Sequence, residues 1–390
     1  MADGSRHSLY AVKEVTYGVT PNNPALDLVR ITGTTLGLSK DSLESEEIRS
    51  DRQITDFRLG ANQVGGDINF ELSYGSFDQF LQAVMLSNNW VSPADTGVVS
   101  LGATVSGYDR VAGSFLTDGF LVGQMVTATG FVGAGYNGNS IITAVTALTM
   151  DTTPESGTHG VEAGSADEQI TASESLKCGT LRSSFSFIRH FADIAPVDKP
   201  YYIYKGIEQD SVSLTIAANK MITGVFKVFG QSLITEQDLT SLGVPTYNAP
   251  STTTPLDSFT GSLEEGGTPV AVVTEITLNL VNGIEPRFVV GSKNSIDPTV
   301  KRSNLTGQVT AYFENSALID KFLNETESSL IFELPDGAGN IQRYTIPRFK
   351  YTGGQPDVSG EGPVTLAMPF QALLDSATGT NLIVERTAGV

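Results

Sequence analysis

One strand-and-helix pattern occurs twice in this chain, about 240 residues apart, and it limits the possible folds more than any other feature. The copies are residues 65–84 and residues 306–325. Each copy starts near a glycine, alternates apolar and polar residues, and then spaces its apolar residues as on one side of a helix. We therefore predict a strand followed by a short helix in both places, and a duplicated unit as their origin.

Two strand–turn–helix units can look alike by chance, so the segments downstream of each copy are needed to decide whether a larger unit is duplicated. Segments rich in aromatic and β-branched residues follow both copies in the same order and at similar spacing. They are residues 184–189, 201–207, 211–217 and 223–233 after the first copy, and residues 329–334, 341–351 and 362–373 after the second. The chain is therefore predicted to be mainly β, with two related sandwich or barrel units and short flanking helices.

Each predicted helix should close one side of its unit by burying one face. The apolar residues that share such a face are Phe77, Phe80, Leu81 and Val84 in the first copy and Leu318, Phe322 and Leu323 in the second. We expect both sets to be buried.

A change in composition interrupts the first unit between residues 91 and 174. This stretch holds nine acidic residues and one basic residue, so it carries −8 of the net charge of −19. Strand-like segments at residues 122–129 and 140–150 predict a small inserted β domain. The pattern G-x-G-x-x-G at residues 133–138 precedes β-branched residues where a dinucleotide site needs a helix, so it predicts a hairpin turn.

The predicted organisation follows from these boundaries. Residues 1–90 and 176–245 form the first unit, interrupted by an acidic domain at residues 91–175. A linker rich in Pro, Thr, Ser and Gly covers residues 246–268, and residues 269–390 form the second unit. Forty glycines and seventeen prolines favour short strands and tight turns over long helices.

Two long polar segments occupy equivalent positions in the two units. We name residues 40–58 the first arm and residues 282–304 the second arm. Each is either a solvated loop or an arm that contacts another subunit, and their equivalent positions favour arms. The candidate contact residues are Lys40, Glu44, Glu46, Glu47, Arg49, Asp51, Arg52 and Arg58 in the first arm and Arg287, Lys293, Lys301 and Arg302 in the second.

The sequence shows no recognisable catalytic, cofactor or metal site. Cys178 is the only cysteine, which excludes an intrachain disulfide, and His7, His159 and His190 lack ligand-like spacing. No nucleophile has an evident base, so we expect no enzymatic activity. The net charge of −19 argues against a protein that grips nucleic acid phosphates. Without a long apolar run or a leader pattern, we expect a soluble chain made in a reducing compartment.

Four segments in order resemble the major tail tube protein of long, non-contractile-tailed bacteriophages. They are residues 45–53, 65–84, 311–324 and 368–375. The likeness spans almost the whole chain except residues 91–174. It implies β tube domains that form rings, stacked rings that conduct the genome during ejection, no catalytic residues, and a place in the virion after synthesis in the bacterial cytoplasm. It also implies tape-measure, tail-terminator and tail-tip proteins as partners, and no membrane.

Where a single-domain protein needs six copies to close a ring, a duplicated chain could do so with three, as a pseudo-hexameric trimer. A ring of six chains is the alternative. We expect polar inner strands with few Lys or Arg, so that double-stranded DNA passes without specific binding. Basic residues of the arms would meet carboxylates of the adjacent ring, and the acidic domain would lie outside. The competing interpretations are a tail-terminator or capsid-decoration protein, or a β-rich adhesin.

Overall fold

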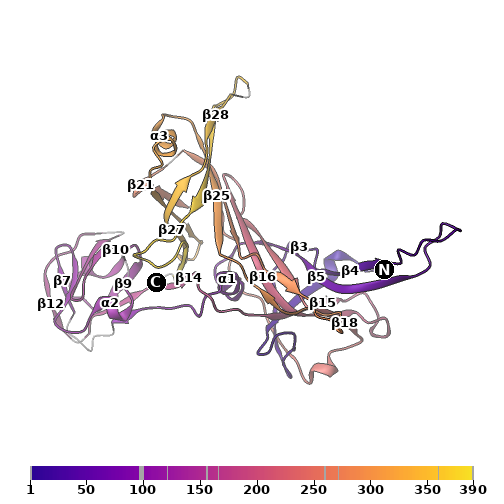
Figure 1. Ribbon diagram of the computed structural model, residues 1–390. Coiled ribbons are helices and arrows are strands. Elements are labelled where there is room, and N and C mark those ends of the chain that lie inside the picture. The colour runs from indigo at the N-terminus through magenta and orange to yellow at the C-terminus, as the bar shows by residue number, and fades with distance from the viewer. Residues whose placement is uncertain are drawn as a thin grey trace.

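The computed structural model describes residues 2–95, 101–120, 122–154, 157–165, 167–258, 261–270, 272–358 and 360–388. The chain is mainly β, which confirms the predicted fold class (Figure 1). Across the described residues the strands form a large sheet of 20 strands, a separate sheet of eight, and a two-stranded ladder. The short 3-10 helices are η1 (Gly4–Arg6), η2 (Ala134–Tyr136), η3 (Pro196–Asp198) and η4 (Thr240–Leu242).

The centre of the large sheet is a continuous antiparallel run that forms a half-barrel. In spatial order its strands are β4 (Gly37–Glu44), β5 (Phe57–Glu71), β17 (Thr223–Gly230), β16 (Tyr201–Ala217), β22 (Val273–Val281), β25 (Asn304–Tyr312), β29 (Thr365–Ala372) and β28 (Gln355–Asp357). The first four belong to the first unit and the last four to the second. Strands β16 and β22 join the units, with Ser211 opposite Val281 and Ala217 opposite Glu275.

The other strands of the large sheet flank this run. Those of the first unit are β1 (His7–Lys13), β2 (Ala25–Leu28), β3 (Gly33–Thr34), β15 (Phe185–Phe191), β18 (Ser232–Glu236) and β19 (Thr246–Asn248). Those beside the second unit are β14 (Glu174–Lys177), β20 (Ser262–Glu265), β21 (Thr268–Pro269), β26 (Ser328–Pro335), β27 (Ile341–Tyr351) and β30 (Ile383–Thr387). Residues 246–268, expected to be a linker, thus contain β19 and β20; residues 259 and 260 lie outside the described residues.

Strand β16 combines two segments that we predicted as separate strands, residues 201–207 and 211–217. It is one strand of 17 residues whose pairing with β17 shifts by one residue between Gln209 and Ser211. Its first half pairs with β15 and β18, and its second half pairs with β17 and β22. The polar residues between the halves are buried and include a β-bulge, so the strand continues through the gap between the two predicted segments.

The largest apolar cluster spans both units and contains helix α1 (Asp78–Val84), and a smaller cluster around Leu26 and Ile203 lies in the first unit. The predicted face of α1 is confirmed, because Phe77, Phe80, Leu81 and Val84 are at most 3% exposed. In α3 (Ala317–Leu323), Leu318 and Phe322 are only partly buried.

The prediction that Leu323 is buried is wrong, because its side chain is 68% exposed. Its equivalent, Leu81, lines an apolar pocket together with Leu278 and Leu305 of the second unit. Helix α1 therefore packs beside the junction of β16 with β22. Within the described residues, α3 has no such junction beside it.

The eight-stranded sheet forms the inserted domain, at the opposite end of the molecule from the first arm (Figure 1). Its elements are β6 (Ala94–Asp95), β7 (Leu101–Thr104), β8 (Gly107–Arg110), α2 (Phe115–Asp118), β9 (Met125–Thr129), β10 (Gly138–Val145), β11 (Thr149–Pro154), β12 (Glu162–Ser165) and β13 (Gln169–Ala172). It has its own apolar cluster. Residues 133–138 join antiparallel β9 and β10, which confirms the predicted hairpin turn. Residues 96–100, 121, 155–156 and 166 of the predicted domain lie outside the described residues.

The entry and exit of the inserted domain are adjacent. The Val91 N–H donates to the Ser175 carbonyl at 3.1 Å, and the Ser175 N–H returns a bond to Val91 at 2.8 Å. The domain is anchored on the second unit, where Arg343 Nη1 donates to the Gly123 carbonyl at 2.7 Å and Ser173 Oγ to Glu385 Oε1 at 3.1 Å. A short paired connection and buried polar contacts therefore fix its position.

Candidate functional site

The strand pairings align the two units residue by residue. Strand β5 lies between β4 and β17, as β25 lies between β22 and β29. Strand β16 corresponds to β27 continued by β28: Glu208 faces Phe229 of β17, and Lys350 faces Gln371 of β29. Each contact of one unit can therefore be compared with the same place in the other.

This comparison identifies two unpaired sheet edges. In the first unit, the second half of β16 carries β22 on its outer edge. The corresponding edge of β28 has no strand partner among the residues that the structure describes. The outer edge of β4, which corresponds to β22, has none there either. The half-barrel thus ends on both sides in backbone donors and acceptors that could pair with another chain.

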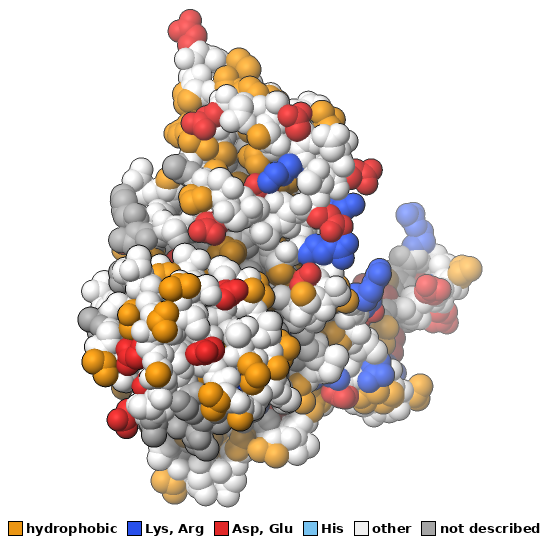
Figure 2. All heavy atoms as spheres, turned by 90° about the vertical axis from the view of Figure 1, so that its left-hand side faces the viewer, with side chains coloured by type: hydrophobic (Ala, Val, Ile, Leu, Met, Phe, Trp, Pro, Cys, Tyr) orange, Lys and Arg blue, Asp and Glu red, His pale blue; other side chains and the backbone are white. Residues whose placement is uncertain are grey.

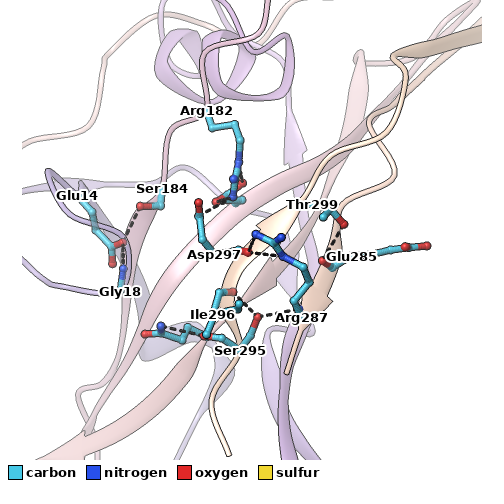
Figure 3. Close-up of polar contacts among 12 residues, drawn as sticks. Glu14, Gly18, Arg182, Ser184, Glu285, Arg287, Ser295, Ile296, Asp297 and Thr299 are labelled. Atoms are coloured by element: carbon cyan, nitrogen blue, oxygen red, sulfur yellow. Dashed lines mark hydrogen bonds and ion pairs between the residues drawn. The ribbon is translucent and has the colours of Figure 1, made fainter. Parts of the chain in front are cut away.

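The second arm folds onto the first unit. It contains the two-stranded ladder of β23 (Glu285–Arg287) and β24 (Ile296–Thr299) (Figure 3). The Asn62 N–H of β5 donates to the Lys293 carbonyl at 2.8 Å, and Asn62 Nδ2 donates to Asn294 Oδ1 at 2.6 Å. Gln231 Nε2 donates to the Ser295 carbonyl at 3.0 Å. The first unit therefore supplies a fitted receptor for the second arm.

An ion-pair cluster completes this contact. Arg182 Nη2 donates to Asp297 Oδ1 of the second arm at 2.9 Å and to Glu208 Oε1 of β16 at 2.5 Å. Burial raises the pKa of Glu208 and the bond from Arg182 opposes that rise. Beside the cluster, buried Glu14 accepts bonds from the Gly18 N–H and from Ser184 Oγ, both at 2.7 Å (Figure 3). Sequence patterns did not single out Arg182, Glu208 or Asp297, because they meet only in the folded chain.

Three of the four basic residues predicted in the second arm make contacts within this chain. Arg287 Nε donates to the Asp297 carbonyl at 2.8 Å, which links β23 to β24 within the second arm. Lys293 Nζ donates to the Leu59 carbonyl of the first unit at 2.8 Å, and Lys301 pairs with Glu285. Arg302 is exposed.

The first arm, in contrast, extends from the body as the tip of the β4–β5 hairpin (Figure 1). Its ion pairs are local: Arg49 Nη2 lies 2.8 Å from Asp51 Oδ2, and Arg58 Nε lies 2.9 Å from Asp56 Oδ2. The remaining predicted contact residues are exposed, namely Lys40, Glu44, Glu46, Glu47 and Arg52. Ile48 is 99% exposed, which is a large solvent exposure for an apolar side chain.

The half-barrel has one apolar and one polar face. The apolar face lies on the core. Along five central strands the residues of the opposite face include Gln63, Asp67, Asn69, Glu71, Lys227, Ser211, Ser213, Thr215, Glu275, Thr277, Asn279, Thr306, Gln308 and Thr310. Among these, Lys227 is the one basic residue. The same alternation places Val225 and Phe229 of β17 and Val281 of β22 on this face, which is otherwise hydrophilic and weakly acidic.

Figure 2 views the molecule from the side of the inserted domain. The surface of this domain shows hydrophobic and acidic side chains. Its exposed apolar residues include Val105, Val111, Val132 and Val161. Arg110, its basic residue, is buried and pairs with Asp118.

Among the described residues, no three His, Cys, Asp or Glu side chains are grouped as metal ligands. None of the helices there has the length and apolar character to span a bilayer. The sequence model of one protein family, described as Phage tail tube protein, matches residues 4–372. No curated protein matches the chain.

Proposed function

Because the chain belongs to the phage tail tube protein family, we propose that it polymerises into stacked rings that form the tube of a long, non-contractile tail. The family makes it a structural component of the virion. The tube would conduct double-stranded DNA into the host during ejection, and the chain would be made in the host cytoplasm. Forming the tube and conducting DNA through it require no catalytic residue.

The junction of β16 with β22 carries this proposal. It is a complete antiparallel contact between two equivalent units, formed here inside one chain. The unpaired edges of β28 and β4 are the two halves of a second such junction. When β28 of one copy pairs with β4 of the next, the contact is head-to-tail, and such contacts form a ring when the rotations between copies add up to a full turn. By equivalence with the intrachain junction, Gly353 would lie opposite Ser39 and Gln355 opposite Gly37 of the neighbour.

The duplication supports three copies per ring. Each chain supplies two units, so three chains place six similar units around the axis in a pseudo-hexameric ring. Pro356 lies in β28 and has no N–H to donate, so this edge offers fewer hydrogen bonds than β16 does. The junction between chains would therefore be weaker than the one within a chain, and folding would precede assembly.

The polar face of the half-barrel would line the channel. Its Ser, Thr, Asn and Gln side chains are uncharged, and its carboxylates outnumber Lys227. At physiological salt, screening confines the repulsion of DNA phosphates to about 8 Å. Such a wall neither pairs with the duplex nor holds it. The inserted domain, with its acidic charge, would lie on the outside of the tube.

Electron microscopy and native mass measurement of the purified protein test this proposal. We expect tubes, and ring intermediates with three times the chain mass of 41.4 kDa. Six chains per ring would refute the trimer, and single rings that never stack would indicate a terminator. Isolated monomers under all assembly conditions would refute the tube. Tape-measure, terminator and tip proteins are the further partners we propose, and co-purification from virions identifies them.

A further inference from the structure

The two arms are equivalent segments in different environments. Asp56 and Asp297 each lie ten residues before the repeated glycine, Gly66 or Gly307. In the second arm Asp297 contacts Arg182 of the preceding unit, whereas in the first arm Asp56 pairs, within the described part of the chain, with Arg58 of the same exposed hairpin. Among the described residues, no segment covers the first arm in the way that the first unit covers the second arm. The first arm therefore has, within those residues, no surface like the one on which its equivalent folds.

We propose that the first arm folds onto the second unit of the neighbouring copy in the same ring, as the second arm folds onto the first unit within the chain. This inference rests on the proposed ring. It assigns the first arm to a contact within a ring, whereas the sequence suggested a contact between rings. The geometry is consistent with ring closure, because the arm continues from β4, the strand that would pair with that same neighbour.

The receptor on the second unit has the same elements as the occupied one, but it is uncovered. Arg182 lies three residues before Phe185 of β15, and Glu325 lies three residues before Ser328, the equivalent position of β26. Phe185 faces Ile207 of β16 and Ser328 faces Phe349 of β27, so Glu208 and Lys350, the next residues, are equivalent. The ion pair Arg182–Glu208 thus corresponds to the pair Lys350–Glu325, with the two charges exchanged.

Solvent exposure distinguishes the two receptors. The side chains of Arg182 and Glu208 are 27% and 4% exposed beneath the second arm. Those of Lys350 and Glu325 are 36% and 84% exposed, and their nitrogen and oxygen atoms lie 3.8 Å apart. Asn62 is half-buried by the second arm, whereas its equivalent, Ser303, is exposed. A covering segment is therefore missing from the second unit at the place where the first unit has one.

The charges of the first arm suit this receptor. In the occupied receptor, one cation meets two carboxylates, those of Glu208 and Asp297. In the open receptor, Lys350 is the cation, Glu325 is one carboxylate, and Asp56 of the neighbour would be the second. Arg348, two residues from Lys350 on the same strand, already pairs with Glu327 at 2.6 Å. Lys350, whose Nζ lies 3.8 Å from Glu325 Oε2, is therefore the cation left for Asp56. A second copy of this chain is thus the partner that fits.

Cross-linking with a short bismaleimide tests the contact. The test chain carries Gln53→Cys and Ser303→Cys, equivalent to Asn294 and Asn62, whose side chains are bonded at 2.6 Å. A chain with Asn294→Cys and Asn62→Cys is the matched control. Both chains also carry Cys178→Ser, because the Cys178 thiol contacts the Ser303 side chain and would compete for the reagent. In isolated rings we expect covalent trimers from the test chain and intrachain links from the control.

The outcomes separate this inference from the proposed function. If the unmodified protein forms no rings, the proposed function fails. If rings form but test chains link only after rings stack, or never link while the control does, the arm inference is overturned. If the cysteine variants do not assemble, exchanging the charges of Asp56 and Lys350 tests the same contact. Asp56→Lys should raise the concentration needed for half-assembly severalfold, and adding Lys350→Glu should restore it. Absence of rescue in chains that still form rings also overturns the inference.

Discussion

Replacing Leu323 with Ala should weaken assembly without unfolding the chain. Leu323 is 68% exposed, whereas its equivalent Leu81 is 2% exposed beside Leu278 and Leu305 of the next unit. If the neighbouring copy covers Leu323 to the same extent, about two-thirds of a leucine side chain leaves water on ring closure. At about 1.5–3 kcal/mol for a fully buried leucine, this burial contributes about 1–2 kcal/mol per junction. Loss of that amount raises the dissociation constant of each junction about 5- to 30-fold.

Leu81→Ala is the matched control, because the same side chain is removed where the partner unit belongs to the same chain. That change should cost about 2–5 kcal/mol of unfolding free energy. Leu323→Ala should change the unfolding free energy of the monomer by less than about 0.5 kcal/mol. Urea unfolding of dilute protein measures stability, and sedimentation across a concentration series measures assembly. If Leu323→Ala assembles like the unmodified protein, or destabilises the monomer as much as Leu81→Ala does, the reasoning from equivalent positions is refuted.

Four further changes probe other parts of the structure. Gly307→Ala should lower the unfolding free energy measured in urea by about 1–3 kcal/mol, because a Cβ there would lie 2.4 Å from the Thr277 carbonyl oxygen. Gly337→Ala is the control and should be neutral, because no atom lies within 4 Å of its Cβ position. Equal effects of the two changes would contradict the steric argument. Burial raises the pKa of Glu385, so the folded state binds its proton more tightly than the unfolded state, and the unfolding free energy should fall as pH rises through the folded pKa. Glu385→Gln should remove this loss, and parallel pH profiles of the two proteins between about pH 4 and pH 8 would argue against it. Residues 92–173 can be replaced with a short glycine turn, since Val91 and Ser175 are already paired. Tubes should still form, with a smaller outer diameter. An unchanged diameter in micrographs would show that the inserted domain is not external. Glu46→Lys combined with Glu47→Lys should block tube formation while circular dichroism shows a folded chain, and normal tubes would disprove the role of the first arm.

Patterns in the sequence were sufficient for the β class and for the face of α1. Alternation along β5 and the spacing of Phe77, Phe80, Leu81 and Val84 are local consequences of strand and helix geometry, so they can be read without tertiary information. The same holds for the turn at residues 133–138, where β-branched residues follow the glycines. Those predictions needed only neighbours along the chain.

Leu323 and β16 show where local patterns are insufficient. Leu323 has the same helical spacing as Leu81, yet burial requires a second sheet beside the helix, and periodicity does not encode that sheet. The polar residues Glu208, Gln209 and Asp210 lie between two segments that we predicted as separate strands, but a bulge allows them to be buried within one strand. Glu208 and Asp210 are bonded there to distant partners, Arg182 and the Ile284 N–H. In both cases the deciding contact is remote in sequence.

The sequence by itself indicated two similar β units, an acidic insertion and two polar arms, because repetition and composition are properties of residue order. Only the tertiary structure decided that β22 pairs with β16, that the second arm lies on the first unit, and that β4, β28 and the first arm are left without equivalent partners. The physical reason is that backbone hydrogen bonds at a sheet edge and ion pairs such as Arg182–Asp297 depend on which segments meet in space.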